Sequence, residues 1–204
     1  MKQILLFTLS VWLFLLVVSC GTQNVETDLP AGLDKKHGAY SYIKGDRWVS
    51  MILDYEVARL RKEDKYFPLD VMIANHDLKS LTVTRESLIL FDANGKGYNL
   101  PPIDEIQEKY SNLWADSLFK YPSAFSDDQS LTSFTYYRVQ RSNFFPRTAG
   151  AAQVTNKVII RPKGYIDDRL YFPMPDLGID KQKLILRLVA PELDMPFDLV
   201  FTVK

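Results

Sequence analysis

Cysteine and histidine are almost absent from this chain. Its 204 residues include one cysteine, Cys20, and two histidines, His37 and His76. A single cysteine excludes an intramolecular disulfide, and the two histidines lack the spacing of a zinc site. We expect both to be solvated, His37 after a tether and His76 in a turn. The sequence therefore predicts a fold without disulfides, metal or cofactor.

An excess of charge of either sign is absent as well. The chain carries 25 basic and 25 acidic residues, so its formal net charge is zero. Proteins that bind nucleic acid usually present a basic patch, because phosphate contacts dominate their affinity. The short basic clusters, Lys35-Lys36 and Arg59 to Lys62, stand beside acidic residues. This balance argues against nucleic acid as a partner and against adhesion to anionic lipid by charge alone.

The known catalytic motifs are missing too. The chain has no Gly-x-Ser-x-Gly elbow, P-loop or Gly-x-Gly-x-x-Gly turn. Ser117 to Lys120 fits Ser-x-x-Lys, but it stands at the end of a predicted helix and its companion motifs are absent. Asp92 to Gly95 begins like a calcium loop, yet Ile103 occupies the twelfth position, where the loop needs a glutamate. We read this segment as a hairpin turn.

Two pairs of adjacent acidic residues are the remaining candidates for catalytic carboxylates. Asp127-Asp128 and Asp167-Asp168 are neighbours in sequence, whereas glycosidase carboxylates must converge on one bond. We expect all four to be solvated loop residues. The sequence thus predicts no catalytic residue and a non-enzymatic protein. The alternative is an enzyme or small-ligand carrier whose site is assembled from dispersed residues.

The first twenty residues contain the most specific signal. Lys2 precedes an apolar run from Ile4 to Val18, which ends at Ser19 and Cys20. This order predicts a secretory signal peptide over residues 1–19. Fifteen residues of helix rise only about 22 Å, which is short of the roughly 30 Å hydrocarbon core. An ordinary signal peptide with an incidental cysteine, or an uncleaved anchor, is the alternative.

Val17-Val18-Ser19-Cys20-Gly21 resembles the lipobox of bacterial lipoproteins. The resemblance implies cleavage before Cys20 and acylation of its thiol, which would hold the protein at a membrane of the cell envelope. Gly21, where an aspartate would retain the protein at the inner membrane, resembles outer-membrane sorting. If the host has two membranes, we expect the periplasmic side of the outer one. Residues 20–38, without a periodic apolar stripe, are predicted to be a tether.

Residues 39–204 are predicted to form one mainly β domain. Apolar and polar residues alternate with a period of two in many segments, as in strands with one buried face. These segments are 51–58, 69–74, 88–91, 134–139, 158–161, 184–189 and 197–204. Turn residues such as Asn94-Gly95 separate them. At least seven antiparallel strands indicate a β-sandwich, with a core that includes Val71, Ile73, Leu90, Leu186, Phe197, Leu199 and Phe201.

One inserted segment follows a helical period instead. Apolar residues recur at three- and four-residue spacing from Ile103 to about Lys120, after Pro102 and with acids in the first turn. We predict an amphipathic helix that buries Ile106, Tyr110, Leu113 and Leu118. Trp114 lies at the margin of this stripe. Trp114, Tyr121 and Phe125 are therefore candidate interface residues for a protein partner.

Several strands together resemble bacterial extracellular immunoglobulin-like domains of the telokin-like type. The resemblance rests on the strand Val71 to Asn75, the hairpin strand Leu88 to Asp92 with Asn94-Gly95, and the closing strand Phe197 to Val203. It implies an immunoglobulin-like β-sandwich, from which the inserted helix departs. Three aromatic pairs, Tyr136-Tyr137, Phe144-Phe145 and Tyr171-Phe172, are expected to be buried rather than exposed. Together these features predict an envelope lipoprotein with a binding or structural module.

Overall fold

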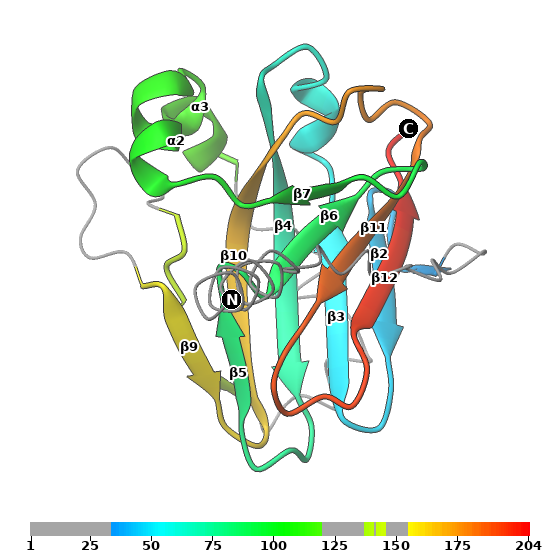
Figure 1. Cartoon of the computed structure of the whole chain (residues 1–204), viewed down its shortest axis with the longest axis vertical. Coiled ribbons are helices and arrows are strands. Elements are labelled where there is room, and N and C mark those ends of the chain that lie inside the picture. Colours follow the sequence, from blue (N-terminus) through cyan, green and yellow to red (C-terminus); the bar gives the residue numbers. More distant parts are fainter. Residues whose placement is uncertain (1–33, 120–136, 141, 146–154) are drawn as a thin grey trace, which may run out of the picture.

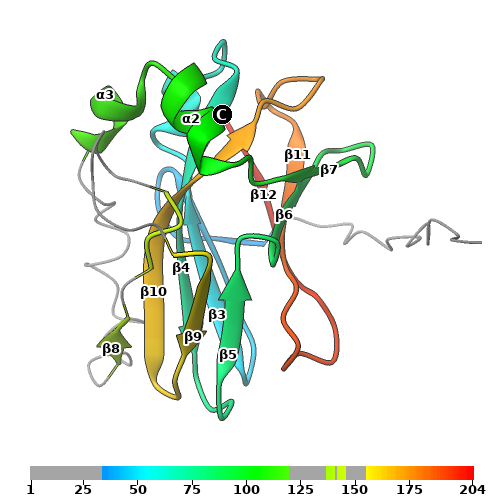
Figure 2. The ribbon, with the colours of Figure 1, turned by 60° about the vertical axis from the view of Figure 1, so that its left-hand side comes forward.

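The computed structural model describes residues 34–119, 137–140, 142–145 and 155–204. Strands dominate these ranges, and they form two main layers of β-sheet (Figure 1). The second layer stands beside the first when the molecule is turned (Figure 2). The predicted mainly β, sandwich-like architecture is confirmed.

The first layer is a six-stranded sheet. Its strand order is β1 (Lys35–Lys36), β2 (Ser41–Gly45), β3 (Val49–Asp54), β4 (Tyr66–Asn75), β10 (Gly164–Pro173) and β8 (Arg138–Val139). All neighbours pair antiparallel except β8 and β10, which are parallel. The long pair of β4 and β10 holds its register over ten residues, so it forms the spine of this layer.

The second layer is a four-stranded sheet, and a two-stranded sheet stands beside the sandwich. The strand order in the second layer is β12 (Phe197–Thr202), β11 (Lys183–Leu188), β6 (Leu88–Phe91) and β7 (Gly97–Asn99). The separate pair is β5 (Leu81–Thr84) and β9 (Lys157–Ile160). Asn94-Gly95 turns β6 into β7, with Gly95 at φ 80°, a conformation that favours glycine.

The core lies between the two layers. Alternate residues of β4 belong to one buried apolar cluster with residues of β6, β11 and β12, because side chains of a strand point to opposite faces in turn. Every predicted core residue is buried, namely Val71, Ile73, Leu90, Leu186, Phe197, Leu199 and Phe201. Phe144-Phe145 and Tyr171-Phe172 are buried as expected. Tyr137 is half-buried, and Tyr136 lies outside the described residues.

The inserted segment differs from the single helix predicted. It forms two short helices, α2 (Ile103–Lys109) and α3 (Leu113–Ser117), in addition to the 3-10 turn η1 (Ala58–Leu60). Tyr110 adopts an extended conformation, with φ −112° and ψ 101°, and this ends α2. Both helices stand at one end of β4 and β10 (Figure 2). Ile106, Tyr110 and Leu113 join the core there, as predicted.

The predicted tether is wrong at its C-terminal end. Lys35 and Lys36 form β1 and pair with Ile43 and Tyr42 of β2. Asp34 also bonds to β12, because its N–H donates to the carbonyl of Val200 at 2.9 Å. The domain therefore begins at or before Asp34. Within the described ranges, no helix has both the length and the apolar character needed to span a bilayer.

Candidate functional site

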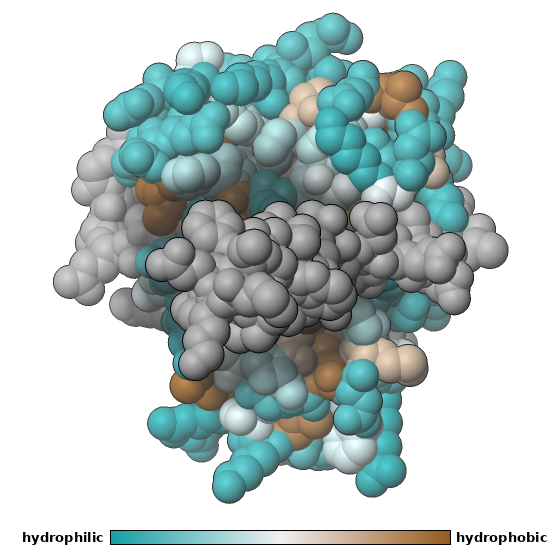
Figure 3. Space-filling model, viewed as in Figure 1, coloured by the Kyte–Doolittle hydropathy of each residue, from teal (hydrophilic) through white to brown (hydrophobic). Residues whose placement is uncertain are grey.

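α3 and the two residues that follow it expose three large apolar side chains. Trp114 is 66% exposed, Leu118 is 63% exposed and Phe119 is 37% exposed, although the neighbouring Leu113 is only 6% exposed. We call these three residues the α3 platform. Other large apolar residues also reach solvent, but they are scattered over separate elements. Hydrophobic residues come to the surface beside the α2–α3 region on the face shown in Figure 3.

One of the three candidate interface residues, Trp114, belongs to the platform. Its exposure agrees with its marginal position on the apolar stripe. The prediction that Leu118 is buried is wrong, because the break at Tyr110 changes the direction of the chain before α3. Tyr121 and Phe125, the other two candidates, lie outside the described residues.

A buried carboxylate fixes α3 to the rest of the domain. Asp116 of α3 is fully buried, and its Oδ1 accepts a hydrogen bond from Arg61 Nε at 2.8 Å. Its Oδ2 accepts a bond from Tyr110 Oη at 2.5 Å. Burial disfavours the charged guanidinium, but the hydrogen bond and charge of Asp116 raise the pKa of Arg61. Burial and Asp116 likewise raise the pKa of Tyr110, so the phenol stays protonated and donates.

Arg169 connects α3 to the first sheet. It stands on β10 and holds both carboxylate oxygens of Asp70 on β4, with Nε–Oδ1 and Nη2–Oδ2 distances of 2.8 Å. Its Nη1 donates to the carbonyl of Asp116, and its Nη2 donates to the carbonyl of Phe119 at 3.5 Å. Charge-assisted, bidentate bonds of this kind fix geometry more firmly than neutral ones. Arg169 thereby anchors the backbone at both ends of the segment that carries Leu118.

A second carboxylate extends this network to β3. Asp54 pairs in register with Asp70, which pairs with Arg169, so the three charged residues lie side by side across three strands. Burial raises the pKa of Asp54 to about 7, and the charges of Asp70 and Glu56 act in the same direction. The Glu56 N–H, 2.8 Å from Asp54 Oδ1, and Arg169 act in the opposite direction. Asp54 therefore carries a proton through much of the acidic range.

The prediction that Asp167-Asp168 are solvated loop acids is wrong. Both residues stand on β10, and Asp168 is buried. Its Oδ2 accepts the N–H of Phe144 at 2.8 Å, and its Oδ1 accepts the N–H of Arg169 at 2.9 Å. Asp168 thus has a structural role, holding the chain around Phe144 against β10. Asp127-Asp128 lie outside the described residues.

The prediction for His76 is also wrong, because its ring is half-buried and bonded on both sides. Ser50 Oγ lies 2.6 Å from Nε2, and Tyr137 Oη lies 2.5 Å from Nδ1. Burial lowers the pKa of His76, and the charge of Lys163 lowers it further. The imidazole is therefore neutral at pH 7 and links β3, β4 and the chain that enters β8.

The calcium-loop-like and Ser-x-x-Lys segments have structural roles. Asp92 Oδ1 accepts the N–H groups of Asn94 and Lys96, so this segment is the predicted hairpin turn. Ser117 Oγ donates to the Trp114 carbonyl at 2.6 Å and closes α3. Within the described ranges, no three His, Cys, Asp or Glu side chains gather as metal ligands would. Cys20 lies outside these ranges.

Sequence reasoning missed the charged network beneath the platform. Its members come from five separate segments, and Arg169 lies 99 residues from Asp70. One local signal was present: Asp70 interrupts a run of apolar residues in β4, and aspartate is depleted in strands. The partner could not be read from that signal, because it depends on the register between β4 and β10.

The fold and this surface define the class of molecule: a sandwich-like β-protein with a rigid, apolar platform at one end. Comparison with protein-family models, with curated proteins and with solved structures gave no match.

Proposed function

We propose that this protein is a lipid-anchored envelope lipoprotein whose immunoglobulin-like sandwich binds another envelope protein through the α3 platform. The lipobox-like segment that ends at Cys20 supports the anchor. The strand pattern of residues 71–97 and 197–203 supports an immunoglobulin-like arrangement of the sandwich. The contrast between exposed Trp114 and buried Leu113 carries the binding role.

The backbone of the α3 platform is already fixed in the conformation that would bind a partner. A large aromatic side chain that is already exposed on a fixed backbone loses little freedom when it is buried by a partner. Arg61, Arg169 and Asp116 hold that backbone through buried, charge-assisted bonds. Trp and other aromatics dominate the energetics of protein interfaces when they are desolvated near the centre. The partner surface would be apolar, because Leu118 and Phe119 extend the same face.

Site-specific photocrosslinking in the native envelope tests the platform. A photoreactive amino acid at Trp114 should give one discrete protein adduct. The same amino acid at Met195, an exposed apolar residue in the loop between β11 and β12, is the matched control. Equal labelling at both positions, or no protein adduct at Trp114, would reject the proposed interface.

Fractionation tests the anchor separately. Cys20→Ala should release the protein from membranes or leave its leader uncut, because no thiol remains to be acylated. Thr22→Ala leaves the thiol in place and should remain membrane-bound. A Cys20→Ala protein that is cleaved normally and stays in the membrane fraction would contradict lipid anchoring.

A further inference from the structure

The buried arginines of the domain differ in how their charge is compensated. Arg169 is bidentate with Asp70, and Arg187 is bidentate with Asp198 through Nε–Oδ1 and Nη2–Oδ2 distances of 2.6 Å. Arg85, only 7% exposed, is different. No carboxylate in the described ranges lies within ion-pair distance of it.

Neutral groups surround the Arg85 guanidinium instead. Its Nη1 donates to the carbonyl of Phe144 and its Nη2 to the carbonyl of Pro101. The guanidinium carbon lies 4.3 Å from the centre of the Phe145 ring. These contacts fix the side chain, but they leave some of the five guanidinium N–H donors for another acceptor. Among the residues that the structure describes, they also leave its full charge without a direct counter-ion.

This arrangement carries an energetic cost. Burying a guanidinium without an anion costs free energy, because carbonyl dipoles replace water only in part. Burial lowers the pKa of Arg85, even though the charges of Glu86 and Asp168 favour its charged form. Asp168 directs its oxygens to the backbone N–H groups of Phe144 and Arg169. An anion bound against Arg85 would remove this cost.

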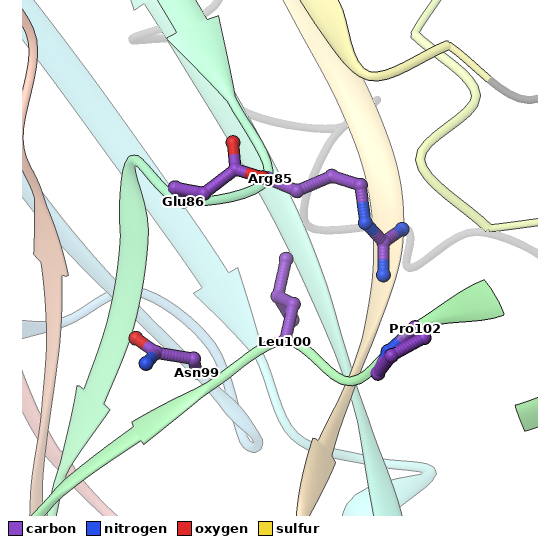
Figure 4. Close-up of a pocket in the computed structure, with 5 residues that line it drawn as sticks. All are labelled: Arg85, Glu86, Asn99, Leu100 and Pro102. Carbon is purple, nitrogen blue, oxygen red and sulfur yellow. The ribbon is translucent and has the colours of Figure 1, made fainter. Parts of the chain in front are cut away.

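A pocket lies beside this arginine. Its volume is about 250 Å³, it is partly open to solvent, and it is lined by Arg85, Glu86, Asn99, Leu100 and Pro102. Figure 4 shows the guanidinium on the Pro102 side of the pocket, with Glu86 and Asn99 on the other side. The pocket therefore combines a buried cation, an amide and two apolar side chains.

We propose that this pocket binds a small organic monocarboxylate. Its carboxylate would accept from Arg85, and its short apolar part would contact Leu100 and Pro102. The negative charge of Glu86 at the rim opposes a second charge on the ligand, so phosphate and dicarboxylates fit less well. This site shares no residue with the α3 platform, and the proposal is independent of the proposed function.

Titration of the purified protein with butyrate tests the proposal. Butanamide has nearly the same shape without the charge, and inorganic phosphate has charge without the apolar part. Butyrate should shift the Arg85 Nε–H resonance in nuclear magnetic resonance spectra and saturate. It should bind at least about tenfold more tightly than butanamide or phosphate, since a hydrogen bond to a charged group is worth more than a neutral one.

Two variants separate binding from folding. Arg85→Gln should weaken butyrate at least about tenfold, whereas Arg161→Gln, the same change at an exposed arginine, should have no effect. Arg85→Gln also removes the bonds to Phe144 and Pro101, so its thermal unfolding is measured in parallel. Asn99→Asp adds a negative charge at an exposed position of the pocket and leaves Arg85 intact. It should weaken butyrate and leave butanamide unchanged.

Three results would overturn the proposal. One is equal binding of butyrate and butanamide, and another is tighter binding of phosphate. The third is an Arg85 resonance that does not respond to butyrate up to about 50 mM, well above the dissociation constant expected for a favourable ligand of this size. In each case Arg85 would only hold the chain around Phe144 and Pro101.

Discussion

Asp54 makes the stability of this protein depend on pH in an unusual direction. Burial raises its pKa from 3.8 to about 7, so the folded state binds a proton that the unfolded state has released. Between these two values the folded protein holds more protons than the unfolded chain, and the free energy of unfolding falls as pH rises. The contribution of the protonated carboxyl is complete below pH 3.8 and is lost by about pH 7.

The substitution Asp54→Asn isolates this effect. Asparagine keeps an oxygen for the Glu56 N–H but cannot ionise. The loss amounts to at most about 4 kcal/mol, because one pKa unit corresponds to about 1.4 kcal/mol. The variant should therefore exceed the parent in unfolding free energy by up to about 4 kcal/mol at pH 8, by about 1.6 kcal/mol at pH 5 and by about 0.6 kcal/mol at pH 4.

Chemical denaturation followed by tryptophan fluorescence at these three pH values measures the difference. Asp194→Asn removes an exposed carboxylate from the β11–β12 loop and provides the background. A variant that is destabilised equally at pH 5 and pH 8 would refute the reasoning. In that case the carboxylate of Asp54 is charged throughout and stabilises the fold as an anion.

The other predictions concern packing, the platform and one turn. Leu199→Ala should lower the free energy of unfolding by about 2–5 kcal/mol, because it removes buried surface and leaves a cavity in the core; a loss below about 1 kcal/mol would show a core that collapses to fill the space. Leu113→Ala should lower the free energy of unfolding by about 2–5 kcal/mol, whereas Trp114→Ala should lower it by less than about 1 kcal/mol. If chemical denaturation shows equal losses for the two variants, Trp114 belongs to the core. Gly95→Ala should cost about 1 kcal/mol in thermal unfolding, because its positive φ disfavours a side chain, and an unchanged melting temperature would contradict that strain.

Alternation was enough to predict the core residues and several strands, but it missed β2, β5 and the long strand β10. The pattern in Leu184 to Leu188 and Phe197 to Phe201 determines which face of each strand is buried, because a shift of one residue would expose the apolar set. Asn94-Gly95 likewise predicted its turn from local geometry alone. Such features depend on neighbours in sequence, and they were predictable for that reason.

The break between α2 and α3 could not be predicted from the local sequence pattern. The three- and four-residue spacing continues from Ile106 through Tyr110 to Leu113, so the sequence reads as one helix. In the structure Tyr110 turns its hydroxyl to Asp116 and its ring to Tyr171, at 5.2 Å between centroids. These tertiary contacts stabilise an extended residue at that point and outweigh the helical period. Leu118 then follows directly after a second, separate helix and faces solvent.

The charged residues under the platform were unpredictable for a different reason. Asp70, Arg169 and Asp116 each read as solvated when taken alone, since unpaired charges are seldom buried. Only the register between β4 and β10 and the return of the chain at α3 bring them together. The same is true of Arg85, whose neighbours Phe144 and Pro101 are remote in sequence.

The place where the chain joins the sandwich has a mechanical consequence. Asp34 bonds to β12 through its backbone and through Oδ2, which accepts the Val200 N–H at 2.7 Å, while the next two residues pair with β2. If Cys20 is fixed in a membrane, tension would enter the domain at this seam and divide between the two sheets. The seam and α3 lie on opposite sides of the molecule (Figures 1 and 2). A force from the membrane would then act on the side of the sandwich that is remote from the α3 platform and leave the platform undistorted.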